Sequence, residues 1–83
     1  MLSRGDIFLA AGDLTSARLF YQYAADAGDG GAALRLGQTF DPVFLQQANL
    51  TRLRGDPKQA AYWYRRALEL GNTEAKVLLD TRN

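Results

Sequence analysis

The feature that most constrains the fold is an internal repeat, because the segment that begins at Gly12 recurs 43 residues later at Gly55. Eight identical pairs share this offset: Gly12/Gly55, Asp13/Asp56, Ala17/Ala60, Tyr21/Tyr64, Ala24/Ala67, Gly28/Gly71, Ala32/Ala75 and Leu36/Leu79. From Ala17 onward, successive identities are three or four residues apart, which is the spacing of one face of an α-helix. The repeat therefore predicts two copies of one helical unit, each interrupted by a turn at the shared glycine.

Each copy carries start and stop signals for a helix. Asp13 and Asp56 stand where the carboxylate of an N-cap residue accepts hydrogen bonds from free backbone N–H groups. Gly28 and Gly71 stand where a left-handed C-cap residue is needed. These signals place the two repeated helices at about residues 13–27 and 56–70.

Further helices are predicted before and after the repeated ones. A Gly-x-x-Phe pattern begins at Gly5 and again at Gly37, and it indicates helices over about 2–11 and 30–40, with another beginning near Thr73. Val, Ile and Thr, which favour strands, are scarce. The predicted fold class is all-α, a short α-solenoid of antiparallel helix pairs with about two and a half repeats.

Composition limits the chemistry that the chain can perform. Its 83 residues are enough for one small domain, which we place at residues 1–83. The absence of Cys and His excludes thiol nucleophiles, histidine bases and the usual zinc and haem ligand sets. No serine has a recognisable base beside it. We therefore expect no enzymatic activity, no catalytic residue, no cofactor and no metal site.

Charge and hydropathy argue against nucleic acid and membrane partners. The formal net charge is only +1, too small to draw the chain onto nucleic acid or an anionic bilayer. Arg65 and Arg66 follow two aromatic residues, but Tyr64 holds a core position in the repeat, so we expect these arginines to face solvent. No apolar stretch approaches the roughly 20 residues of a bilayer span, and the N-terminus lacks the pattern of a secretory signal. The sequence does not indicate in which cellular compartment the protein lies.

The repeat resembles the Sel-one-like repeat, a variable-length relative of the tetratricopeptide repeat. The matching elements are Ala32-x-x-x-Leu36-Gly37-x-x-Phe40, Gly55-Asp56-x-x-x-Ala60-x-x-Trp63-Tyr64-x-x-Ala67 and Gly71-Asn72-x-x-Ala75. The first pair departs from the pattern, with Arg4 in place of Leu and Phe20-Tyr21 in place of Trp-Tyr. In the third repeat Asp80 stands where Gly is expected.

The resemblance implies a non-enzymatic adaptor or scaffold, often part of a larger bacterial protein, that binds a protein or peptide on the concave face of its helices. Rows on the first helix of each pair line that face in such proteins, and here they are Leu2, Asp6, Leu9, Leu34, Gln38, Asp41, Val77 and Thr81. The alternative is a purely structural role, as a terminal or capping repeat or as a homodimer that completes its own core. Because a helix is predicted from residue 2, we also expect the chain to be a fragment of a longer protein.

An inserted segment at residues 41–54 interrupts the repeat. The first helices of the pairs are offset by 32 residues and the second helices by 43, so the second repeat holds 11 additional residues. Asp41-Pro42 is a good cap and first position for a short helix that ends near Ala48.

Two interpretations of residues 41–54 are open. In the first, the segment folds back as a cap that extends the core, with Phe44 and at least one of Leu50 and Leu53 buried. In the second, it is a docking element for a partner. We expect the cap.

Overall fold

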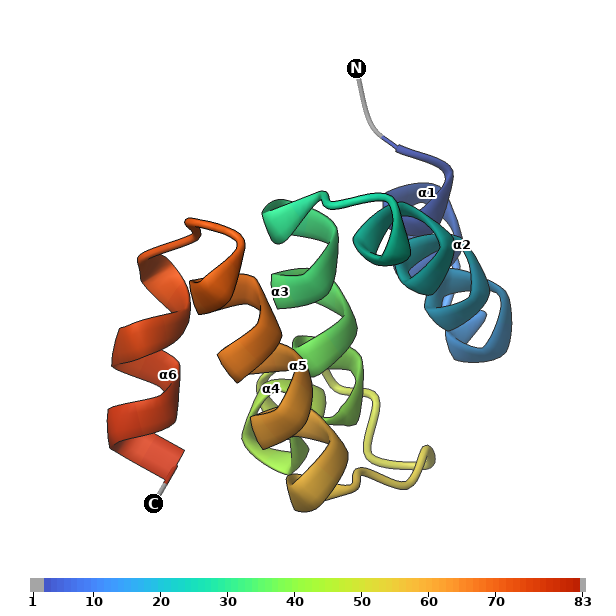
Figure 1. The fold of residues 1–83 in the computed structure, drawn as a ribbon. Coiled ribbons are helices and arrows are strands. Elements are labelled where there is room, and N and C mark those ends of the chain that lie inside the picture. The colour runs from blue at the N-terminus through green and yellow to red at the C-terminus, as the bar shows by residue number, and fades with distance from the viewer. Residues whose placement is uncertain (1–2, 83) are drawn as a thin grey trace.

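The computed structural model describes residues 3–82, and this part of the chain is all-helical (Figure 1). Its elements are α1 Arg4–Ala10, α2 Leu14–Asp26, α3 Gly30–Phe40, α4 Pro42–Gln47, α5 Pro57–Glu69 and α6 Glu74–Arg82. Every predicted helix is present, and no strand occurs within residues 3–82. The prediction of an all-α fold is confirmed. Residue 2, where the first helix was expected to begin, lies outside the described residues.

The predicted caps form at both ends of the repeated helices. Asp13 and Asp56 accept hydrogen bonds from backbone N–H groups in the first turns of α2 and α5, at distances of 3.1 to 3.3 Å. Gly28 and Gly71 follow these helices with φ angles of +99° and +94°. These angles lie in the left-handed region, which residues with a side chain rarely adopt. This explains why both copies of the repeat have glycine there.

Successive long helices lie against one another. α1 contacts α2, α2 contacts α3, α3 contacts α5 and α5 contacts α6, and the contact between α3 and α5 is the most extensive. Figure 1 shows the helices in this order across the molecule, with α1 and α2 at one side and α6 at the other. The core is therefore distributed along the molecule, because it draws on α2, α3, α5 and α6.

Small residues let the repeated helices approach their neighbours closely. Ala17, Ala60 and Ala67 are between 0% and 4% exposed. Tyr21 and Tyr64, at equivalent positions of the repeat, are buried beside them with exposures of 3% and 1%. A larger side chain at these alanines would have to displace a neighbouring helix.

Each buried tyrosine packs on a glycine of the preceding long helix. A Cβ atom added to Gly5 would lie 2.5 Å from the ring of Tyr21, and one added to Gly37 would lie 2.6 Å from the ring of Tyr64. Real Cβ atoms do not approach a ring this closely, so only glycine fits. The Gly-x-x-Phe pattern of the sequence therefore marks two equivalent helix crossings.

Arg18 of α2 bonds to the end of α3 and to the inserted segment. Its Nη2 donates a hydrogen bond of 2.7 Å to the carbonyl oxygen of Thr39 and a longer one of 3.4 Å to that of Arg54. Its guanidinium carbon lies 3.9 Å from the centroid of the Phe40 ring, a cation–π arrangement. Partial burial lowers the pKa of Arg18.

The inserted segment forms α4 and a turn that returns to α5. Leu45 is buried, at 2% exposure, whereas Phe44 is only partly buried, as are Leu50 and Leu53. The expectation that Phe44 and at least one of Leu50 and Leu53 are buried is therefore wrong, because all three are only partly buried. Asp41, the N-cap of α4, is itself 1% exposed, and the residue four positions later on the same helix face is Leu45.

Candidate functional site

Three of the residues predicted to line a partner groove lie inside the domain or against its core. Leu34 is 5% exposed and belongs to the hydrophobic core. Asp41 is 1% exposed and accepts hydrogen bonds from three different side-chain or backbone groups. Leu9 is partly buried against the core. In this structure, neither Leu34 nor Asp41 is open to a partner.

Four further predicted residues lie on α1, α3 and α6. Asp6 is half-buried and bonded to Tyr21, and Gln38 accepts a hydrogen bond from Arg35. Val77 is 62% exposed, and Thr81 is exposed with its hydroxyl bonded to carbonyl oxygens one turn earlier in α6. Leu2 lies outside the described residues.

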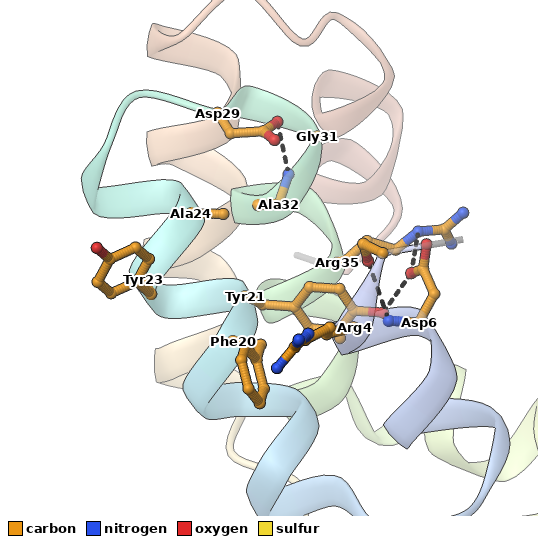
Figure 2. A pocket seen from close by; sticks show the side chains of 12 residues that line it. Arg4, Asp6, Phe20, Tyr21, Tyr23, Ala24, Asp29, Gly31, Ala32 and Arg35 are labelled. Atoms are coloured by element: carbon orange, nitrogen blue, oxygen red, sulfur yellow. Dashed lines mark hydrogen bonds and ion pairs between the residues drawn. The ribbon is translucent and has the colours of Figure 1, made fainter. Parts of the chain in front are cut away.

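A groove of about 440 Å³ lies between α1, α2 and the first half of α3. We call it the α1–α3 groove, and its principal side chains are Arg4, Asp6, Phe20, Tyr21, Tyr23 and Arg35. Figure 2 shows these side chains, with Ala24 and Ala32 between them. The small residues leave the space open because their side chains end at Cβ.

Tyr21 forms the fixed part of the groove. Its ring packs on Gly5, and its hydroxyl donates a hydrogen bond of 2.5 Å to Oδ1 of Asp6 (Figure 2). Burial, and then the bond to Asp6, raise the pKa of Tyr21 well above its ordinary value. The same hydroxyl holds the pKa of Asp6 below its usual range. Tyr21 therefore stays neutral and Asp6 stays charged at neutral pH.

Aromatic side chains border the groove on α2. The ring of Phe20 stacks on Phe8, with centroids 5.4 Å apart, and the guanidinium carbon of Arg4 lies 5.9 Å from the Phe20 centroid. Tyr23 is 80% exposed and points away from Tyr21 in Figure 2. An exposed tyrosine offers a stiff apolar surface and a hydroxyl to a partner at little entropic cost.

Arg35 of α3 faces these aromatic residues from the other side of the groove. Its Nε lies 3.9 Å from Oδ1 of Asp6, in a pair whose side chains are 50% and 30% exposed. Its Nη1 donates a hydrogen bond of 3.1 Å to Oε1 of Gln38. Asp29 is the N-cap residue of α3, and its Oδ1 accepts a hydrogen bond from the backbone N–H of Ala32. The groove thus offers apolar contact, aromatic stacking and cationic donors, which are the elements of a binding surface.

A related arrangement lies at the other end of the molecule. Tyr64 donates a hydrogen bond of 2.6 Å to Oδ2 of Asp41, and Nε of Arg82 donates to the same oxygen at 2.8 Å. A second hollow, of about 360 Å³, lies beside this cluster and is bordered by Pro42, Val43 and Leu79. Tyr64 and Arg82 both bond to Asp41, so this cluster joins α5 and α6 to the end of α3.

Sequence reasoning missed four residues of the α1–α3 groove. Arg4 and Phe20 were noted only as departures from the repeat, and Arg35 and Tyr23 were not singled out. One signal was available for Tyr23, because Leu19 and Tyr23 are four residues apart and both lie off the repeated alanine and tyrosine face of α2. No sequence signal pointed to Arg4 and Arg35 as residues of one groove, since they reach it only because α1 and α3 both pack on α2.

The described part of the chain holds neither a metal site nor a membrane-spanning helix. Within residues 3–82, no three His, Cys, Asp or Glu side chains gather as a metal site requires. None of the helices described for this chain has the length and apolar character of a bilayer span. A scan against family models and searches of curated proteins and of solved structures found no match.

Proposed function

We propose that this protein is a non-enzymatic interaction module, an adaptor or scaffold that binds a polypeptide partner in the α1–α3 groove. We further propose that its helices form a short α-solenoid of antiparallel pairs, similar to the Sel-one-like repeat. The observation that carries the proposal is the exposure of Tyr23, at 80%, on the border of a groove that also holds two arginines and two further aromatic residues. An exposed aromatic residue beside unfilled space is typical of interaction surfaces.

Two aromatic side chains of the groove are already held in place, which favours binding without rearrangement. Tyr21 is held by its packing on Gly5 and by its hydrogen bond to Asp6, and Phe20 is held by stacking on Phe8. Side chains that are already ordered lose little conformational entropy when a partner binds. A partner would therefore meet a preformed surface.

The test is a selection of short random peptides on the isolated protein, followed by mapping of the selected peptides. Amide nitrogen–proton NMR spectra should show shifts confined to α1, α2 and the first half of α3. Tyr23→Ala should weaken binding of the selected peptides by at least about tenfold, because exposed aromatic anchors carry a large share of interface energy.

Tyr62→Ala is the matched control, since Tyr62 is also an exposed tyrosine, at 53%, but lies on α5. It should leave peptide affinity unchanged. Peptides that map elsewhere, or lose equal affinity in both variants, would contradict the proposed site. A selection that yields no peptide would contradict the proposed function.

A structural capping role is the second candidate, and α6 favours it. Asp80 occupies the repeat position at which Gly5 and Gly37 receive a tyrosine ring. It is exposed and forms an ion pair of 3.7 Å with Lys76. A further helix could not pack a tyrosine there as α2 and α5 do, and a polar outer face is what terminal repeats require.

Light scattering over a range of concentrations tests this role. A cap predicts a monomer that associates when Lys76 and Asp80 are both replaced by leucine, because the replacement exposes a new apolar face. If the double variant stays monomeric, α6 is not a cap. If the unmodified protein is already a dimer, self-association is the better structural explanation.

A further inference from the structure

The two ends of α6 are held differently. Within Glu74–Arg82 only Ala75 is buried, at 0% exposure, and it belongs to the hydrophobic core. At the other end of the helix, Leu79 and Arg82 border the second hollow, of about 360 Å³, opposite residues of α4 and α5. The start of α6 is therefore packed, whereas its end borders empty space.

Arg82 attaches the end of α6 to the domain. Its Nε donates a hydrogen bond of 2.8 Å to Oδ2 of Asp41, and the two side chains are 26% and 1% exposed. The ion pair between Lys76 and Asp80 is exposed and joins residues of the same helix, so it attaches α6 to no other element. Arg82 thus makes the polar side-chain contact that connects α6 with a distant part of the chain.

The helix is also supported on one side. Its extensive contact within residues 3–82 is with α5, whereas α3 lies between α2 and α5 and contacts both of them extensively. Figure 1 shows α6 at one side of the molecule. An element with few buried apolar contacts can open while the rest of a domain stays folded.

We propose that the pair of Arg82 and Asp41 is a latch, and that α6 opens as one unit when this pair breaks, while the other helices stay folded. Opening enlarges the second hollow and uncovers the face of α5 that α6 contacts. In the open state Asp41 keeps two donors, the hydroxyl of Tyr64 and the backbone N–H of Val43. The latch lies away from the α1–α3 groove, so its failure would leave the proposed function standing.

The test is amide hydrogen exchange of the folded protein, measured by NMR at several urea concentrations that are too low to unfold it. Amides of α6 report the opening of this helix, and amides of α3 report the opening of the core. In the unmodified protein, α6 amides should be at least about tenfold less protected than α3 amides. Their protection should also depend less on urea, because a local opening exposes less surface than global unfolding does.

Arg82→Met removes the donors of the latch and keeps an unbranched apolar side chain. It should lower the protection of α6 amides by about tenfold or more, because a buried carboxylate loses a charged donor in the closed state.

Arg18→Met is the matched control. Arg18 is also a partly buried arginine that bonds to other elements, but its partners Thr39 and Arg54 lie outside α6. These contacts persist when α6 opens. Arg18→Met should therefore lower the protection of α3 amides and leave that of α6 amides unchanged.

A double-mutant cycle tests whether Arg82 acts through Asp41. In an Asp41→Asn background, Arg82→Met should change the protection of α6 amides by no more than about twofold, because the charged partner is already absent. The comparison of α6 with α3 in the unmodified protein needs no variant, so it tests the opening of α6 even where a variant fails to fold.

Three results would overturn the proposal. Equal protection and equal urea dependence in α6 and α3 would mean that α6 opens only with the whole domain. Unchanged protection of α6 in Arg82→Met would mean that the pair is not a latch. A loss of α6 protection in Arg18→Met as large as the loss in α3 would mean that these helices open together.

Discussion

The hydroxyl of Tyr64 donates a hydrogen bond of 2.6 Å to Oδ2 of Asp41, a residue 23 positions earlier in the chain. Both residues are only 1% exposed. Asp41 also accepts the backbone N–H of Val43 as the N-cap of α4 and the Nε of Arg82 at the end of α6. One buried carboxylate thus joins α4, α5 and α6 to the end of α3, and its donors must all be present to offset the cost of its burial.

Removal of the Tyr64 hydroxyl should therefore destabilise the fold. In Tyr64→Phe, Asp41 keeps its burial but loses one donor, so the free energy of unfolding should fall by about 1–3 kcal/mol. Urea denaturation followed by circular dichroism measures this loss. Tyr62→Phe is the control, because the exposed side chain of Tyr62 can be replaced without leaving a buried group unpaired; an equal loss in both variants would contradict the role given to Asp41.

Alkaline pH should weaken the same contacts. Burial, followed by the bonds to Asp6 and Asp41, raises the pKa of Tyr21 and Tyr64 well above the ordinary value of 10.0. The fold therefore favours the neutral phenols, and the stability that they contribute is complete below pH 10 and is lost as the pH rises beyond it.

The measurement is the free energy of unfolding on either side of pH 10, in the unmodified protein and in the double variant Tyr21→Phe/Tyr64→Phe. The double variant should be less stable at neutral pH but should lose less stability as the pH rises. If both proteins lose the same amount, other groups are responsible for the alkaline loss.

The repeated core could be predicted from the sequence because its signals are local. Ala17 and Tyr21 lie at helical spacing within α2, as Tyr64 and Ala67 do within α5. Gly28 and Gly71 mark helix ends with a backbone conformation that only glycine adopts easily. These rules require no knowledge of which helices meet. The confirmed helices and caps follow from them.

The candidate site could not be predicted in the same way, because it depends on contacts between distant parts of the chain. Asp41 and Arg82 are 41 residues apart, and nothing in the local pattern of either indicates the other. Asp41 was expected both to cap α4 and to line the groove. It does cap α4, and its exposure of only 1% excludes the groove role. Arg4 and Arg35 lie on different helices and border one groove only through the packing of both helices on α2.

Gly37 should be intolerant of a single methyl group. Alanine is favoured over glycine within a helix by ~1 kcal/mol, but a Cβ at Gly37 would lie 2.6 Å from the ring of Tyr64 and 3.2 Å from the carbonyl oxygen of Ala60. Overpacking should outweigh propensity, so Gly37→Ala should lower the free energy of unfolding by ~1–3 kcal/mol. Thermal and urea unfolding both measure the change.

Gly31→Ala provides a control in the same helix. Gly31 is exposed, and an added Cβ would meet only Oδ1 of Asp29 at 3.3 Å. Its unfolding free energy should be unchanged or higher by up to about 1 kcal/mol, because helix propensity favours alanine and no buried neighbour opposes it. Two glycine variants of equal stability would show that the contact between Gly37 and Tyr64 can relax without cost.

The inserted segment should depend on Leu45 more than on Phe44. Leu45 is 2% exposed and faces the core side of α4, so Leu45→Ala should cost about 2–5 kcal/mol through lost burial and the cavity left behind. Phe44 is only partly buried, so Phe44→Ala should cost less, about 1–2 kcal/mol. Urea denaturation of the two variants under identical conditions decides the order.

A larger loss for Phe44→Ala would contradict this packing of α4. Losses below about 1 kcal/mol in both variants would mean that residues 41–54 do not belong to the core, and the interpretation of this segment as a docking element would then replace the cap.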